Sequence, residues 1–213
     1  SGVPIVCKPY CTIMEFPQRL AGCKVAVFID FAFEDMEVTY PAKRLEEEGA
    51  IVVVVGSHAA GTKYTGKYGY PVTSHKTIGD VLPDDFDALV IPGGFSPDYM
   101  RRSADMLAFI VGMLDLDRPV AAICHGPWML CSARLADTSP VCAGKRVTSF
   151  VAIKDDLINA GAKWVDEAVV VDGPMITART PHDLTVFCQA IIRETAVRTL
   201  RGTSSTQGRD TAL

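Results

Sequence analysis

The chain has 213 residues, of which 48% are apolar and 22% charged, and its formal net charge is −4. This length suits one α/β domain with a sizeable core. The acidic balance supplies no basic field to attract a phosphate backbone, so we expect no nucleic-acid partner. The longest apolar run, residues 106–114, is about half of the roughly 20 residues that a membrane span needs, so we expect no membrane partner.

The cysteines indicate a reducing compartment. Their number is odd and they are scattered through apolar surroundings, unlike the dense even framework of a secreted disulfide scaffold. No N-terminal segment combines a basic start, an apolar run and a small-residue cleavage site. We therefore expect an intracellular, cytoplasmic protein with mostly reduced thiols at Cys7, Cys11, Cys23, Cys124, Cys131, Cys142 and Cys188.

Apolar runs and helical segments alternate along the chain. Short, largely β-branched runs predict strands buried on both faces at residues 25–29, 51–55, 88–91, 120–123 and 169–171. Helical character is found between and after them, at residues 37–48, 104–114, 127–135, 153–160 and 183–198. The alternation predicts an α/β, flavodoxin-like sandwich: a mostly parallel sheet with helices on both faces and right-handed crossovers.

Two segments interrupt this alternation. Residues 62–75 place glycines and a proline among alternating Tyr and Val, which predicts a small antiparallel excursion. Residues 172–174, Asp-Gly-Pro, lie between two apolar runs and predict a second hairpin. No linker divides the chain. We expect an irregular N-terminal arm, a single domain and a polar, disordered tail over residues 1–21, 22–200 and 201–213 respectively.

The strongest local signal is Ala122-Ile123-Cys124-His125-Gly126, directly after a predicted strand. It is typical of a nucleophile elbow with cysteine in place of serine, because small residues on both sides let the chain turn sharply beside unpaired amides. Those amides and the dipole of the following helix are expected to lower the pKa of the thiol. The alternative is a buried, inert cysteine that fills the core.

The loops after two other strands carry further candidates. Ligands bind in open α/β sheets where the carboxyl ends of strands converge. Glu34 follows the first strand, where its carboxyl could share a proton with Cys124 or be a solvated acid at a helix N-terminus. Gly93 and Gly94 follow the third strand, where their N–H groups could form an oxyanion hole or an ordinary tight turn.

Two polar side chains could complete a catalytic group. His125 is a candidate base, although spacing does not fix whether its ring meets the thiol, and surface or interface packing is the alternative. Asp98 could orient such a histidine or could cap a helix. No phosphate loop or GxGxxG follows a strand, and Cys7 with Cys11 is a weak metal pair. We expect no cofactor and no metal.

Four blocks in this order resemble the ThiJ/PfpI family of the class I glutamine amidotransferase-like superfamily. The resemblance spans about residues 24–197, and the family includes PfpI-type intracellular proteases, the parkinsonism-associated deglycase group and glutathione-independent glyoxalases. The blocks are Phe33-Glu34-Asp35, Ile91-Pro92-Gly93-Gly94, Ala122-Ile123-Cys124-His125-Gly126-Pro127, and residues 154–161 (KDDLINAG) followed by Trp164-Val165-Asp166.

The resemblance implies roles for the residues at the predicted sheet edge. Cys124 is implied as the nucleophile and Glu34 as the carboxyl partner beside its sulfur. Gly93 and Gly94 are implied as backbone donors, with Pro127 beside them in the substrate-binding region.

The resemblance also implies assembly. His125 matches the PfpI-type branch, in which an acid from a neighbouring subunit completes a Cys-His-acid arrangement. Asp98 falls at the matching position, where some members have Glu. A homo-oligomer (dimer, trimer or hexamer) with its site near a subunit interface is therefore implied.

These residues support one principal function and two alternatives. We expect a Cys124-dependent enzyme acting on 2-oxoaldehydes, either as a glutathione-independent glyoxalase that turns methylglyoxal into lactate or as a deglycase acting on protein adducts. The first alternative is an intracellular cysteine peptidase or amidase with His125 as base. The second is a redox sensor or chaperone in which Cys124 is oxidised to a sulfinic acid.

Overall fold

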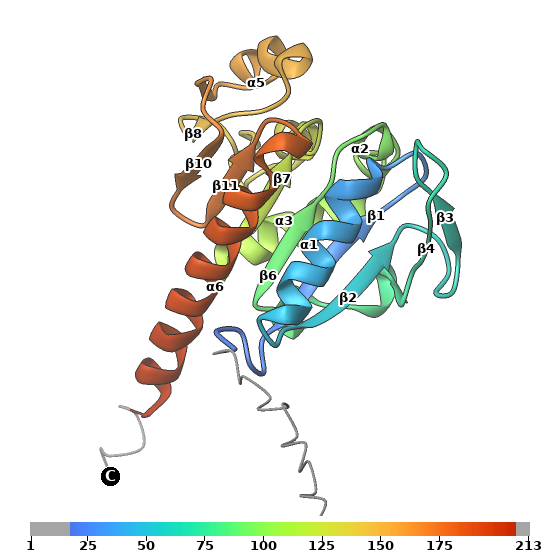
Figure 1. Cartoon of the computed structure of the whole chain (residues 1–213). Helices are drawn as coiled ribbons and strands as arrows, with labels where there is room; N and C mark the ends of the chain where they lie inside the picture. The colour runs from blue at the N-terminus through green and yellow to red at the C-terminus, as the bar shows by residue number, and fades with distance from the viewer. Residues whose placement is uncertain (1–17, 208–213) are drawn as a thin grey trace, which may run out of the picture.

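A computed structural model describes residues 18–207, and the side chains of residues 18–200. Its centre is a seven-stranded sheet of order β10-β11-β7-β6-β1-β2-β5 with helices on both faces (Figure 1). All neighbouring strands are parallel except the β10 and β11 pair. The predicted flavodoxin-like sandwich is confirmed. The strands are β1 (Lys24–Ile29), β2 (Ile51–Gly56), β5 (Lys76–Thr77), β6 (Ala88–Ile91), β7 (Val120–Ile123), β10 (Val169–Asp172) and β11 (Met175–Ala178).

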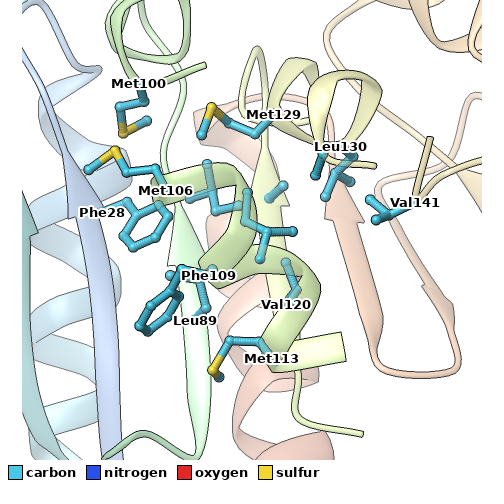
Figure 2. Packing of buried hydrophobic residues seen from close by; sticks show 14 of the residues in the cluster. Phe28, Leu89, Met100, Met106, Phe109, Met113, Val120, Met129, Leu130 and Val141 are labelled. Atoms are coloured by element: carbon cyan, nitrogen blue, oxygen red, sulfur yellow. The ribbon is translucent and has the colours of Figure 1, made fainter. Parts of the chain in front are cut away.

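Strand β1 shows how the sheet separates two cores. Val25, Val27 and Ile29 lie in the cluster that covers one face, whereas Ala26 and Phe28 lie in the cluster on the other face. Side chains alternate along a strand, so a continuous apolar run supplies both faces. In Figure 2, Phe28 packs beside Phe109 of α3 (Ala104–Asp115), and the two ring centroids are 5.4 Å apart.

The other face is covered by α1 (Asp35–Glu47) and by α6 (Leu184–Gln207), which contact each other. The described part of the chain has three further α-helices, all of them short. They are α2 (Ser96–Met100), α4 (Trp128–Ser132) and α5 (Lys154–Asn159).

Both predicted excursions are confirmed. Strands β3 (Lys63–Thr65) and β4 (Pro71–Thr73) form an antiparallel pair outside the main sheet. Strands β10 and β11 form the second hairpin, and β11 then joins β7 in parallel. A further pair, β8 (Arg146–Val147) and β9 (Lys163–Trp164), is parallel.

Several elements differ from the predictions. Strand β10 is only partly buried because it forms the edge of the sheet, rather than being covered on both faces. Helix α4 ends at Ser132 and not at 135, because Ala133 is extended and Arg134 pairs with Pro140. The sequence did not predict α2, which is only five residues long.

The chain ends also differ from the predicted boundaries. Helix α6 continues to Gln207, so part of the tail predicted to be disordered is helical. Leu20, placed in the predicted arm, is fully buried and its N–H donates to the Glu48 carbonyl. Cys7 and Cys11 lie outside the described residues. None of the described helices is long and apolar enough to cross a membrane.

Candidate active site

Cys124 occupies a strained turn at the end of β7. Its φ is +60°, a conformation that non-glycine residues seldom adopt. Hydrogen bonds on both sides hold it there: its N–H donates to the Ala178 carbonyl at 3.0 Å, and its carbonyl accepts from the Phe150 N–H at 2.9 Å. A Cβ at Gly126 would lie 2.6 Å from the Ile91 carbonyl oxygen, so the turn requires glycine there. These features are those of the predicted nucleophile elbow.

Glu37, in the first turn of α1, supplies the carboxyl group nearest to the thiol. It is fully buried, and its Oε2 accepts a hydrogen bond from the Gly93 N–H at 2.7 Å. The carboxyl is close enough to the Cys124 thiol for each group to change the pKa of the other, and the buried Oε1 accepts no hydrogen bond from the described residues. A Cβ at Gly93 would lie 2.7 Å from both the Cys124 Cβ and Glu37 Oε2. Glycine at 93 therefore permits this contact.

Glu34 has a different position from the one expected beside the sulfur. It precedes α1 in extended conformation, and its Oε2 accepts from the Glu37 N–H at 3.0 Å. Glu34 is therefore the N-cap of α1. The alternative interpretation expected an acid at this helix N-terminus but a solvated one, whereas Glu34 is buried and lines the pocket over Cys124. The carboxyl contact with the thiol belongs to Glu37, one helical turn further. The sequence analysis missed Glu37, and the available signal was its spacing of three residues from the predicted cap.

The pKa values of Cys124 and Glu37 are linked. Burial, with a smaller contribution from the negative charge of Glu34, raises the pKa of the Glu37 carboxyl to about 8. Burial and then the charge of Glu37 raise the pKa of the Cys124 thiol to about 12, whereas the N–H groups of Gly94 and His125 act in the opposite direction. The expected lowering of the thiol pKa is therefore outweighed by burial. Because the two groups contact each other, they titrate as a pair, and a protonated Glu37 can donate to a thiolate.

The donors that face the sulfur differ in part from those expected. The N–H groups of Gly94 and His125 reach the Cys124 sulfur. The Gly93 N–H instead donates to Glu37 and is unavailable to a ligand. Pro127 has no N–H, is buried and directly precedes α4, so its position is that of a helix start.

His125 turns its ring towards the thiol. Its Nδ1 lies 3.3 Å from the Cys124 Sγ, which settles the orientation that spacing left open. The ring packs against both Phe150 and Trp128, with centroid separations of 5.0 and 5.2 Å. Burial, and then the positive charge of Lys67, lower the pKa of the imidazole. His125 is therefore neutral near pH 7 and has the form of a base.

Asp98 does not join this group within one chain. It lies on α2, forms an ion pair with Arg102, and is absent from the residues lining the pocket over Cys124. Its side chain is 30% exposed. Any contact between Asp98 and His125 would therefore have to come from another copy of the chain.

The pocket over Cys124 has a volume of about 370 Å³. The rings of His125 and Phe150 line it, together with the exposed ring of Phe95 and the side chain of Lys67. A pocket of this size with a nucleophile, two N–H donors, a carboxyl and an imidazole suits a small electrophile such as an aldehyde or an activated carbonyl.

Comparison with known proteins agrees with the site. Residues 23–194 match the model of the DJ-1/PfpI family. "Deglycase PfpI" of Pyrococcus furiosus is 42% identical over 161 residues, covering 76% of this chain and 92% of that protein. "Putative cysteine protease YraA" of Bacillus subtilis is 44% identical over 164 residues, covering 77% and 93%. The crystal structure of Drosophila melanogaster DJ-1beta has a TM-score of 0.74 and 26% identity, covering 87% of this chain and 97% of that one. The resemblance expected from the sequence is confirmed: this chain belongs to the DJ-1/PfpI family.

Proposed function

We propose that the protein is an enzyme that uses Cys124 to convert 2-oxoaldehydes such as methylglyoxal, free or as adducts on proteins, into hydroxy acids. The observation that carries this proposal is that one buried thiol lies close to both the Glu37 carboxyl and the His125 imidazole. These two groups can carry out the two proton transfers that the reaction needs. The name deglycase, given to a relative that is 42% identical, supports the same chemistry.

The first step makes the nucleophile. The pKa of about 8 leaves Glu37 ionised in a minority of molecules near pH 7, and in these the thiol proton passes to its carboxylate. The neutral carboxyl then donates to the thiolate while the Gly94 and His125 N–H groups face the sulfur. The sulfur adds to the aldehyde carbon, a C–S bond forms, and the carbonyl oxygen takes up a proton to give a hemithioacetal.

The second step moves a hydrogen between two carbons. The neutral His125 imidazole removes the proton from the former aldehyde carbon and returns it to the neighbouring carbon, which converts the hemithioacetal into a thioester of the hydroxy acid. Water then cleaves the C–S bond, so that methylglyoxal and water together give lactic acid and the free thiol. No electrons leave or enter the reaction.

The pocket favours a small substrate over an extended polypeptide. Its volume of about 370 Å³ is at the lower end of ligand pockets, and the rings of Phe150 and Phe95 bound it. An adduct carried on a protein side chain could still enter, because only its short carbonyl group needs to reach Cys124.

A peptidase or amidase is the second candidate, favoured by the separation of 3.3 Å between the Cys124 Sγ and the His125 Nδ1. A relative named a putative cysteine protease supports it. In this function Asp98 of a second copy would orient His125 within a homo-oligomer. Phe95 and Tyr99, which flank Asp98 and are 51% and 37% exposed, supply an apolar surface for that contact.

Proton NMR of methylglyoxal incubated with the protein tests the proposal. We expect lactate from the wild type, none from Cys124→Ser, strongly reduced formation from Glu37→Gln and His125→Ala, and wild-type formation from Cys188→Ala. The same variants are assayed on a glycated peptide and on casein. Cys124-dependent casein cleavage without lactate or deglycation would replace the proposal with the peptidase. If all three activities were absent and peroxide oxidised Cys124 to a sulfinic acid, the redox-sensor function would replace the proposal.

A further inference from the structure

Two cysteines that the proposed reaction does not use, Cys131 and Cys142, lie together in the core. Cys131 is near the end of α4, after which the chain reverses direction. Arg134 pairs with Pro140 in an antiparallel bridge, and the Val141 N–H donates to the Ala133 carbonyl at 3.0 Å. This pairing brings the two thiols within hydrogen-bonding reach of each other. Both are free thiols.

The surroundings of the pair are apolar on one side and open on the other. Both cysteines belong to the core cluster of Figure 2, where Leu130 and Val141, their neighbours in sequence, lie side by side. Cys142 is fully buried. Cys131, in contrast, lines a pocket of about 420 Å³ on the side of the molecule formed by α4 and α5. A small oxidant can therefore approach one sulfur while the other is shielded.

The charges around the pair favour ionisation of one thiol. Arg101 and Arg134 line the same pocket, and their positive charges act on Cys131 and Cys142 respectively, while Asp156 opposes them at Cys131. The hydrogen bond from Cys131 lowers the pKa of Cys142, and the same bond raises the pKa of Cys131. The two thiols thus share a proton, and the first ionisation of the pair is easier than that of an isolated buried cysteine.

We propose that Cys131 and Cys142 form a dithiol site that a hydroperoxide converts into an intrachain disulfide. When the singly ionised pair holds its shared proton on Cys142, the Cys131 sulfur is the thiolate, and it is the sulfur that the pocket exposes. The Cys131 thiolate attacks one peroxide oxygen, the O–O bond breaks, and the leaving oxygen takes a proton from solvent to become water or an alcohol. Cys131 is then a sulfenic acid. The Cys142 sulfur attacks the Cys131 sulfur, the S–O bond breaks, and the departing hydroxide combines with the Cys142 proton to form water. The two sulfurs together supply the two electrons that reduce the peroxide.

This site is separate from Cys124, and trypsin can distinguish them. Arg118 precedes a proline, so cleavage yields peptide 103–134 with Cys124 and Cys131, and peptide 135–145 with Cys142 alone. In a Cys124→Ser background the first peptide retains only Cys131. We treat this folded, full-length variant with hydrogen peroxide, alkylate it under denaturing conditions, and analyse the peptides by mass spectrometry. A cross-link between 103–134 and 135–145, reversed by dithiothreitol, is the expected result.

Further variants keep the test decisive. In Cys142→Ala, added to the same background, we expect no cross-link and a Cys131 sulfenic acid that dimedone traps. Cys188→Ala, which removes a buried cysteine on α6, should leave the cross-link unchanged. The proposal is overturned if both peptides stay fully alkylatable at a peroxide dose that oxidises Cys124 in the wild type. It is also overturned if Cys142 couples to Cys188 or to another chain instead. Neither outcome depends on whether methylglyoxal is a substrate.

Discussion

Cys124 and Cys188 are two buried thiols whose pKa values are both raised to about 12, for different reasons. At Cys188, inside α6, burial accounts for the rise and the charge of Arg44 opposes it. At Cys124, the Glu37 carboxylate adds to burial, while two N–H groups act in the opposite direction. A carboxylate loses its charge when it takes a proton, so the barrier to ionising Cys124 falls when Glu37 is protonated. Burial alone keeps a thiol protonated and inert, whereas a thiol buried beside a titrating group ionises more or less easily according to the charge of that group.

Removing the Cys124 thiol should affect lactate formation far more than removing the Cys188 thiol. We expect Cys124→Ser to lower lactate formation at least about 10³-fold, because serine is a far weaker nucleophile without a strong base. Cys188 does not line the pocket over Cys124, so the activity of Cys188→Ala should stay within twofold of the wild type. Circular dichroism confirms the fold of both variants. Equal losses in the two variants would mean that Cys124 acts through stability rather than chemistry.

The surroundings of Cys124 are packed so closely around its neighbouring glycines that an added side-chain atom would clash. A Cβ at Gly93 would meet the Cys124 Cβ, the Glu37 Oε2 and the His125 nitrogen at 2.7 to 2.8 Å. We expect Gly93→Ala to lower the free energy of unfolding by about 3 kcal/mol and to abolish turnover. Gly79→Ala is the matched control, because a Cβ there has no atom within 4 Å and should change stability by less than about 0.5 kcal/mol. Urea denaturation measures both; a Gly93→Ala protein as stable as Gly79→Ala would show that the elbow relaxes easily.

The linked titration predicts a two-step pH profile for Cys124. As pH rises through the Glu37 pKa of about 8, the pair loses the first of its two protons and the two groups share the remaining one, so part of the population becomes thiolate with neutral Glu37. The second step follows near 12, when the thiol ionises beside a charged Glu37. We therefore expect the rate of alkylation by iodoacetamide to rise in two steps.

Glu37→Gln should merge these steps into one at a pH below 12. The amide keeps an acceptor for the Gly93 N–H and offers a donor to sulfur, but it carries no charge. Near pH 9, where wild-type Glu37 is mostly charged, we expect alkylation to be about tenfold faster in the variant than in the wild type, whereas near pH 7 the two rates should be similar. Peptide mass spectrometry after timed alkylation gives the rate at Cys124 separately from that at Cys188. An unchanged two-step profile in the variant would show that another group titrates.

Local sequence predicted the fold and the sharp turn at Cys124 well, because short segments of the sequence determine both. Buried parallel strands appear as continuous apolar runs, and the elbow is a five-residue pattern. Helix α2 was not predicted, because its five residues are too few to show a helical hydrophobic periodicity. The contact between Cys131 and Cys142 could not be predicted from the local sequence either, because it depends on the reversal of chain direction after α4.

The roles of backbone and carboxyl groups depended on packing. Gly93 and Gly94 were both predicted as donors, but only the position of Glu37 decides that the Gly93 N–H is occupied. Similarly, Glu34 and Glu37 are one helical turn apart and both are buried. Choosing between them requires the angle at which α1 meets the sheet, and no residue pattern specifies that angle.

Glu34→Gln gives the smallest expected effect and separates the two acids. The glutamine keeps an oxygen that can cap α1 through the Glu37 N–H, while the loss of negative charge removes one cause of the raised Glu37 pKa. The first step of the alkylation profile should therefore move from about 8 to a lower pH by a fraction of a unit, and turnover should change only a few-fold. If Glu34→Gln instead abolished the first step and Glu37→Gln preserved it, Glu34 would be the acid that holds the proton. The difference between Cys124 and Cys188 would then have to be attributed to the helix cap rather than to the first turn of α1.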